Sequence, residues 1–325
     1  MTVYLIRRLM QAGLVLAVMS VLVFLGVFAV GDPIEILISP EATQFEKEEA
    51  RRALGLDLPL WQQYLVFLEN AVQGDLGRSF VFNMPAIQVI LMRFPATLEL
   101  ALVAMLWTVL FGVPLGLWAG LKPNSVSGKT IMAGSILGFS LPSFWVGLML
   151  IMTFAVMLGW LPSTGRAEPV TMFGITSSLW TAKGWAHVML PSINLALGQI
   201  ALVIRLTRAG VREAMLMDYV KFARAKGLTR RRVIGVHVMK NIMIPIVTVL
   251  GLELGSLIAF AVVTESIFAW PGMGKLIIDS INLLDRPIVV AYLMMTVFLV
   301  ILINFAVDVL YSVLDPRVRL KDSGS

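Results

Sequence analysis

Long apolar runs alternate with shorter polar segments along most of the chain, and this pattern predicts membrane-spanning helices. The first run, residues 9–30, is free of charge over about the length that a bilayer requires. A signal peptide is the alternative for this run, because Ala29-Val30-Gly31 weakly resembles a cleavage site, but the run is too long for a typical one. Further runs follow at about 97–121, 130–159, 188–207, 242–264 and 287–311. We predict an all-α integral membrane protein with six transmembrane helices.

The distribution of basic residues predicts the orientation of these spans. Most of the 26 lysines and arginines lie near the N-terminus, in the loop at 122–129, at 205–240 and in the C-terminal tail. Because cytoplasmic loops carry the excess of Lys and Arg, both termini are expected inside. The predicted organisation is an N-terminus and first span (1–30), an extracytoplasmic helical segment (31–96), a five-helix core (97–311) with a cytoplasmic loop at 209–241, and a cytoplasmic tail (312–325).

The segment at 31–96 is the one long polar stretch before the second span. It begins with Gly31-Asp32-Pro33, and residues 46–52 then predict a solvated helix that ends at Gly55. Pro59 opens a second helix, whose predicted apolar face holds Leu60, Tyr64, Phe67 and Leu68. This segment is either a docking platform or a cap on the outer membrane face.

Composition narrows the function classes. With 58% hydrophobic and 14% charged residues, the chain is far from the soluble norm. Without cysteine it has no disulfide or thiolate site, and its two histidines fall in unrelated loops, so no metal site is expected. The net charge of +6 resides in loops and predicts no nucleic-acid partner. Gly128-Lys129-Thr130 resembles the end of a P-loop, but Pro123 stands where that motif needs glycine, so no ATP site is expected.

Small residues and prolines shape two of the spans. Gly112, Gly116 and Gly120 recur every four residues and predict a stripe that permits close helix contact. Pro142 is expected to break the third run. Residues 161–183 are expected to be an outer loop.

The basic segment from Asp218 to Pro245 has the pattern of a helix, a glycine turn and a second helix. Asp218 is predicted to cap the first helix, Gly227 to end it in a left-handed turn, and Thr229 to cap the second. Ala223 and Gly227 lie four apart and predict a small-residue face. Such a helix suits a groove on another protein. The plainer alternative is a loop whose charge only orients the chain.

Acidic and amide side chains within spans are candidates for a pathway. Glu99 and Asp308 lie near span ends, where they are expected to reach the interface, whereas Glu253 lies near mid-depth. Glu253, Asn194 and Gln199 are therefore either part of a translocation path or polar contacts between helices.

Several segments together resemble a known family. DYVKFARAKGL (218–228) resembles the EAA loop of the inner-membrane permease subunits of peptide/nickel-class ABC importers. GLDLPLWQQY and GDLGRS resemble that family's outer segment, TESIFAWPGMGKL its loop between the last two spans, and DVLYSVLDPRVR its C-terminus. The match is nearly full length. Lys221, Phe222 and Ala223 replace the generic Glu-Ala-Ala, and Pro245 lies further downstream than usual.

The resemblance implies a permease subunit of an ATP-driven, binding-protein-dependent importer in the bacterial inner membrane. It would form the path for peptides or a similar small solute, such as glutathione, nickel complexes or glycosides. It implies a second homologous permease in a heterodimer, two ATPase subunits that hold ATP and Mg, an extracytoplasmic solute-binding protein, surrounding lipid, and no cofactor in this chain. The implied ATPase-coupling residues are Asp218, Tyr219, Lys221, Ala223, Arg224, Ala225, Lys226, Gly227 and Leu228. The implied outer loop or gate residues are Glu265, Phe268, Pro271, Gly272 and Gly274.

Two other function classes are weighed against the importer. A proton-coupled secondary transporter would rest on Glu253 and Asp308. A membrane-embedded enzyme has less support, because the chain lacks cysteine, paired histidines, HExxH and a GxSxG elbow.

Overall fold

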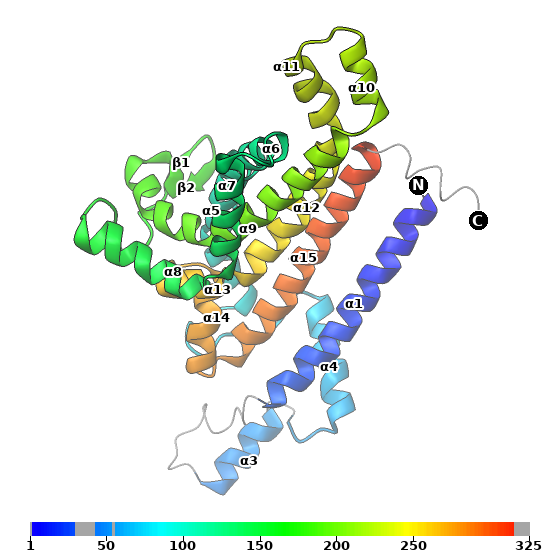
Figure 1. Cartoon of the computed structure of the whole chain (residues 1–325). Helices are drawn as coiled ribbons and strands as arrows, with labels where there is room; N and C mark the ends of the chain where they lie inside the picture. Colours follow the sequence, from blue (N-terminus) through cyan, green and yellow to red (C-terminus); the bar gives the residue numbers. More distant parts are fainter. Residues whose placement is uncertain (1, 30–42, 54–55, 315–325) are drawn as a thin grey trace. The chain divides into compact units, whose positions relative to one another are not determined.

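A computed structural model describes residues 2–29, 43–53 and 56–314, which are almost entirely helical (Figure 1). The predicted features at Gly31-Asp32-Pro33, at Gly55 and in the tail after residue 314 lie outside the described residues. The chain divides into two compact units, each described here by itself. The first comprises Met1–Ala96 and Pro271–Ile301, and the second Thr97–Trp270 and Leu302–Ser325.

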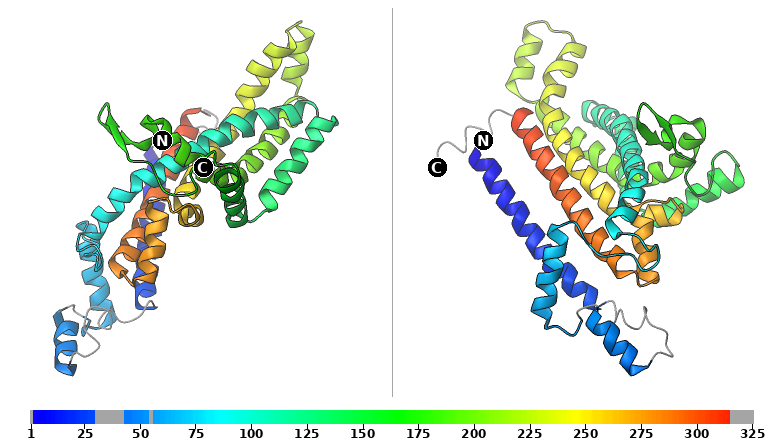
Figure 2. Two further views of the ribbon diagram at one scale, coloured as in Figure 1. Left: turned by 90° about the vertical axis from the view of Figure 1, so that its left-hand side faces the viewer. Right: turned by 180° about the vertical axis from the view of Figure 1, so that it is seen from behind.

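The first unit contains α1 (Thr2–Ala29), α3 (Gln44–Ala53), α4 (Leu60–Val72), the start of α5 (Ala86–Trp107), α14 (Met273–Asn282) and most of α15 (Arg286–Leu314). Helix α4 lies along α1, as Figure 2 shows. The Tyr64 hydroxyl lies 2.9 Å from Ser20 Oγ. The centre of the Phe24 ring lies 5.4 Å from the centre of the Tyr64 ring and 5.8 Å from that of Phe67. The predicted apolar face is therefore confirmed at Tyr64 and Phe67, but Leu60 is exposed.

A buried aspartate organises the polar segment of this unit. Asp285, between α14 and α15, accepts hydrogen bonds from the Ser79 hydroxyl and from the backbone N–H of Phe80 at 3.2 Å. Gly77 adopts a left-handed φ of 90° beside Pro287. The GDLGRSF segment is thus held by a residue more than 200 positions away, which satisfies buried polar groups that otherwise destabilise the fold.

The second unit is built around the long helix α9 (Ala182–Ala214). A π-helical turn (Thr108–Gly112) joins α5 to α6 (Val113–Leu121). The π-helical turn and α6 both pack on α9. A Cβ added to Gly116 would lie 2.6 Å from Thr207 Cβ and 2.8 Å from the Ile204 carbonyl oxygen. A Cβ added to Gly112 would lie 2.9 Å from Val203 Cβ, and one added to Gly120 would lie 2.7 Å from Val211 Cβ. The predicted glycine stripe is therefore confirmed, and its partner is α9.

The third apolar run is broken at Pro142, as predicted. Helix α7 (Val126–Ser140) is bent by 103° from the helix Ser143–Met157, which comprises α8 (Ser143–Leu150) and a π-helical end (Ile151–Met157). The following segment, predicted as a plain loop, contains a hairpin of β1 (Val170–Met172) and β2 (Ile175–Ser177), with Thr171 opposite Thr176. A 3₁₀ turn (Ser178–Trp180) leads into α9.

The remaining elements of the second unit follow α9. They are α10 (Asp218–Ala225), α11 (Arg230–Arg232), a π-helical turn (Val233–Val238), α12 (Met239–Phe260), α13 (Val262–Ile267) and the end of α15. Figure 1 shows α10 and α11 together beyond the ends of α9 and α12.

Among the described residues, four continuous helices are long and apolar enough to cross a membrane. They are Ala86–Leu121, Ala182–Ala214, Arg230–Phe260 and Arg286–Val309. The bent pair of α7 and α8 makes up to five, and Met10–Gly26 is a shorter apolar stretch. A helical, multi-span membrane fold is confirmed, while the count of six stays a prediction.

Candidate functional site

The segment after α9 folds as the predicted helix, glycine turn and helix. Gly227 has φ of 73°, the left-handed conformation that favours glycine. The Leu228 N–H donates to the Ala223 carbonyl at 3.3 Å, and the Gly227 N–H donates to the Arg224 carbonyl at 2.9 Å. This pair of bonds is a Schellman motif, which ends α10 and turns the chain toward α11. We call residues 216–238 the coupling hairpin, after the role that the resemblance implies and that is proposed below.

The inner face of the coupling hairpin is a small apolar core. Val220 and Ala223 of α10 are buried with Val233 and Val238, and Leu228 packs against them. Ala223 is only 4% exposed. The predicted small-residue docking face of Ala223 and Gly227 is therefore wrong for Ala223, because that side chain holds the hairpin together.

The outer face carries exposed apolar side chains among cations. Leu216, Tyr219 and Phe222 are 75%, 38% and 62% exposed. Lys226 Nζ lies 4.6 Å from the centre of the Phe222 ring. Lys221, Arg224 and Ala225 are also exposed. Leu216 and Phe222 were not among the predicted coupling residues, because their exposure depends on which face of α10 packs, and spacing alone does not show that.

The predicted caps of the hairpin differ in detail. Met217, not Asp218, is the N-cap, and no side chain caps the helix. Asp218 is the first helical residue, where its charge favours the positive helix end, and it contacts Lys221 Nζ at 2.8 Å. Thr229 occupies the N-cap of α11, as predicted, without a side-chain hydrogen bond.

The amides predicted within the spans contact neighbouring helices. Asn194 on α9 is buried and donates from Nδ2 to Thr264 Oγ1 at 3.0 Å. Gln199, also on α9, donates from Nε2 to Glu253 Oε2 on α12 at 2.7 Å. Both bonds link helices, so the side chains that the sequence grouped together form two separate pairs.

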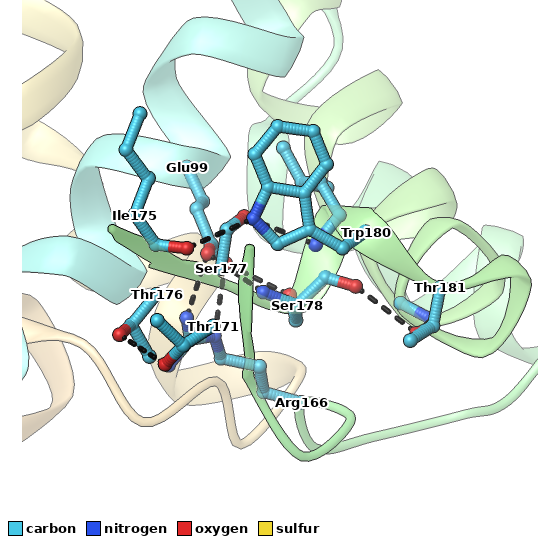
Figure 3. Close-up of polar contacts among 11 residues, drawn as sticks. Glu99, Arg166, Thr171, Ile175, Thr176, Ser177, Ser178, Trp180 and Thr181 are labelled. Atoms are coloured by element: carbon cyan, nitrogen blue, oxygen red, sulfur yellow. Dashed lines mark hydrogen bonds and ion pairs between the residues drawn. The ribbon is translucent and has the colours of Figure 1, made fainter. Parts of the chain in front are cut away.

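Glu99 is the most fully paired acid among these candidates (Figure 3). Its carboxylate on α5 accepts from Arg166 Nη2 at 2.7 Å and Nε at 2.9 Å. The Ser178 backbone N–H (3.0 Å) and hydroxyl (2.8 Å) also donate to it. The side chains of Arg166 and Glu99 are only 12% and 9% exposed. Glu99 is therefore satisfied within the chain, and the expectation that it lies at the membrane interface stays a prediction. We call Glu99, Arg166 and Ser178 the outer clamp.

The predicted outer loop or gate segment is compact rather than loop-like. Glu265, within α13, is fully buried and accepts from the Thr97 hydroxyl at 2.7 Å. Phe268, Gly272 and Gly274 are also buried, whereas Pro271 is half-buried. A gate role for them stays a prediction. In the described part of the chain, no group of three or more His, Asp or Glu side chains is placed to hold a metal.

Comparisons with known proteins agree with this arrangement. The family model described as "Binding-protein-dependent transport system inner membrane component" matches residues 112–320, and the model for its N-terminal part matches residues 1–101. The di/tripeptide transport system permease DppB of Pseudomonas aeruginosa (strain UCBPP-PA14) is 43% identical over 302 residues, covering 89% of this chain and 90% of the relative. The glutathione transport system permease GsiC of Escherichia coli (strain K12) is 39% identical over 319 residues, covering 98% and 99%.

A solved structure shares the fold. The inward-facing MetNI methionine ABC transporter superposes with a TM-score of 0.54 at 18% identity, covering 71% of this chain and 98% of that chain. A second crystal form gives 0.52 at 17% identity over the same shares. At this identity the likeness establishes the fold alone.

Fold, hairpin and relatives define a multi-pass permease subunit of an ATP-driven importer, in which ATP hydrolysis lies on separate subunits. The chain belongs to the inner-membrane components of binding-protein-dependent transport systems, the permease family of ABC importers. It is therefore a bacterial inner-membrane protein whose system includes ATPase and solute-binding partners. The comparisons support this function and not the proton-coupled alternative.

Proposed function

We propose that the coupling hairpin docks an ATPase subunit and transmits its movement to α9 and α12. The observation that carries this proposal is the exposed face of Leu216, Tyr219 and Phe222, flanked by cations. Exposed apolar patches rimmed by charge are typical of protein interfaces. Leu216 and Phe222 are exposed and do not belong to the apolar core of the hairpin, so docking leaves that core intact.

We propose a peptide as the solute. The similar permeases are named for di/tripeptides, dipeptides and glutathione, which is itself a tripeptide. ATP and Mg bind on the partner subunits, and this chain needs no cofactor of its own. Transport of a labelled dipeptide into proteoliposomes, driven by ATP and a binding protein, tests this. Competition by unlabelled peptides but not by free amino acids is expected, and a solute of another class that competes better would contradict it.

The proposed topology has six spans and both termini in the cytoplasm. The first span is α1 and the third is the bent pair of α7 and α8, which together with the four continuous helices make six. The strongly basic coupling hairpin supports its cytoplasmic placement. A second, homologous permease completes the path as a heterodimer, and Pro271, Gly272 and Gly274 belong to its outer gate.

We propose that Gln199 and Glu253 form a helix-interface contact in the wall of this path. Glu253→Gln keeps an oxygen that accepts from Gln199, so transport should stay near the wild-type rate, whereas Glu253→Leu should reduce it. Uptake assays at several pH values measure both variants. Loss of transport in Glu253→Gln alone would instead assign the carboxylate a direct role in the path.

The docking experiment compares three variants in detergent pull-downs of the tagged chain. Phe222→Glu should keep the second permease and lose the ATPases, with affinity lowered about 30-fold if Phe222 is an interface hot spot. Phe45→Glu, on the exposed α3 helix, is the control and should retain both partners. Ala223→Glu should make the hairpin sensitive to protease, because it buries a charge. Wild-type ATPase recovery with Phe222→Glu would contradict the docking face.

A further inference from the structure

Three arginines follow one face of α9 near its C-terminal end. Arg205, Arg208 and Arg212 are spaced i, i+3 and i+7, which places them on the same side of a helix. We call these residues the arginine stripe. The Arg205 guanidinium lies 4.6 Å from the centre of the Phe139 ring on α7, so the stripe runs beside α7.

Among the described residues no acid is paired with Arg205 or Arg208. Residues 100–167 and 169–212, which hold α6, α7 and α9 up to Arg212, contain no Asp or Glu, and Glu213, next to Arg212, is exposed. In the part of the chain that the structure describes, the Nε atoms of Arg205 and Arg208 are buried without a hydrogen-bond acceptor. Burying a donor that has no acceptor is unfavourable, and guanidinium groups match oxyanions well. Arg205 and Arg208 are only half-buried and Arg212 is exposed, so an anion from outside this chain can reach the stripe.

The position of the stripe along α9 selects the kind of anion. The 33 residues of α9 span about 50 Å, well beyond a hydrocarbon core of about 30 Å. Arg205 precedes the helix end by nine residues, or about 14 Å, so the stripe straddles the membrane boundary. Long arginine side chains at this depth reach toward the headgroup layer.

The neighbouring surface of α7 is apolar and open. Ile136, Leu137 and Phe139 are 55%, 63% and 59% exposed. This arrangement matches a phospholipid. The arginines at the membrane boundary suit its phosphate, and the exposed apolar side chains suit its acyl chains. We propose that the arginine stripe binds the phosphate of an anionic phospholipid in the cytoplasmic leaflet, with an acyl chain along α7. Basic sites between spans on the cytoplasmic side are suited to anionic headgroups.

This inference rests on the proposed topology, which places residues 205–212 on the cytoplasmic side. The topology is tested separately with Ser125→Cys, between α6 and α7. Because the chain has no cysteine, a single introduced thiol is a clean probe. Labelling only from inside supports the topology, and labelling from outside would overturn both the topology and the leaflet assigned to the lipid.

The lipid experiment uses the purified complex with short-chain phosphatidylglycerol, short-chain phosphatidylcholine or inorganic phosphate. Thermal shift gives the apparent affinity, and native mass spectrometry counts bound lipid. We expect phosphatidylglycerol to stabilise the wild type and phosphatidylcholine to have little effect. In Arg205→Gln/Arg208→Gln, affinity should fall about 30-fold, given about 1 kcal/mol per arginine. The matched control, Arg51→Gln/Arg52→Gln, removes two exposed cations of α3 and should keep wild-type affinity.

Each other outcome overturns the proposal. If the double variant bound phosphatidylglycerol as tightly as the wild type, the arginine stripe would not be the binding site. Equal stabilisation by inorganic phosphate would assign a free anion instead of a lipid. Loss of the second permease from the double variant would show that the arginines pair with acids of that subunit.

Discussion

The two ends of α9 satisfy their charged groups in opposite ways. Just before α9 begins, the outer clamp joins Glu99 to Arg166 and Ser178 in a buried set of bonds that lies wholly within the chain. Just after α9 ends, the coupling hairpin exposes Phe222 beside Lys226 and other cations. The first end is closed by its own residues, whereas the second presents a surface that another protein can cover.

This contrast separates an end of α9 that is held rigidly from the end at which we propose that a partner acts. A buried, bidentate ion pair with further donors holds one geometry well, because every lone pair is used. In the hairpin, Val220, Ala223 and Val233 pack into the apolar core, whereas Phe222 is exposed to solvent. Between the two ends, α9 is packed closely along α6 by the glycine stripe. We therefore propose that a push at the hairpin moves these helices together.

Removing Glu99 should have the largest effect. Glu99→Ala leaves the Arg166 guanidinium buried without its carboxylate, and breaking one partner of a buried pair costs about 3–5 kcal/mol. We expect a marked loss of folded protein and a lower Tm of the purified complex. The measurement is fluorescence-detected thermal unfolding in detergent.

The matched comparison is the exposed pair of Lys275 and Asp279, separated by 2.5 Å. Lys275→Gln should change stability by less than about 1 kcal/mol, because solvent screens such pairs. Equal stability losses in the two variants would show that burial of the outer clamp has no special weight.

Loosening α6 from α9 should have the next largest effect. Gly116→Val places side-chain atoms against Thr207 and the Ile204 carbonyl, and overpacking of this kind costs about 1–3 kcal/mol. ATP hydrolysis should then be uncoupled from transport, which is measured as the ratio of the two rates in proteoliposomes. Gly134→Val, at a helical glycine with open space around it, is the control. An unchanged ratio in Gly116→Val would argue against transmission through this contact.

Straining the hairpin turn should have a smaller effect on stability. Gly227→Val forces a β-branched residue into φ of 73°, which costs about 1–2 kcal/mol. Transport should fail while the chain still inserts, because the loss is local to the hairpin. Gly235→Val has open space and no left-handed φ, so it separates added bulk from backbone strain. Normal transport by Gly227→Val would contradict the role of the turn.

The features that the sequence predicted are those encoded by local pattern. The glycine stripe, the break at Pro142 and the left-handed Gly227 follow from the conformational preferences of single residues. The partners of Glu99 did not follow, because Arg166 and Ser178 are 67 and 79 positions away and lie in a segment predicted as a loop. Ala223 was placed on the wrong face, because small size suits a buried contact as well as a docking surface.

The smallest expected effect concerns a fully exposed carboxylate that, like Glu99, accepts from a backbone N–H and a hydroxyl, but has no arginine partner among the described residues. Glu46 accepts from the Thr43 N–H at 2.8 Å and hydroxyl at 2.9 Å, forming a capping box at the start of α3. The Thr43 backbone N–H, followed by its hydroxyl, holds the pKa of Glu46 below its usual value. The bonds therefore stabilise α3 above the unfolded pKa, near 4.5, and this stabilisation is lost as pH falls through the lower folded value.

Hydrogen exchange of the α3 amides in the full complex, corrected for intrinsic rates, measures this effect. Glu46→Gln should lose protection at pH 7 and show little further loss on acidification, whereas Glu48→Gln, on the same exposed helix, should behave as the wild type. The outer clamp has the same N–H and hydroxyl donors, adds the Arg166 guanidinium and is shielded from water, so the loss in Glu99→Ala should far exceed that in Glu46→Gln. Similar losses at the two sites would mean that the shared donors, and not burial, set the strength of the outer clamp.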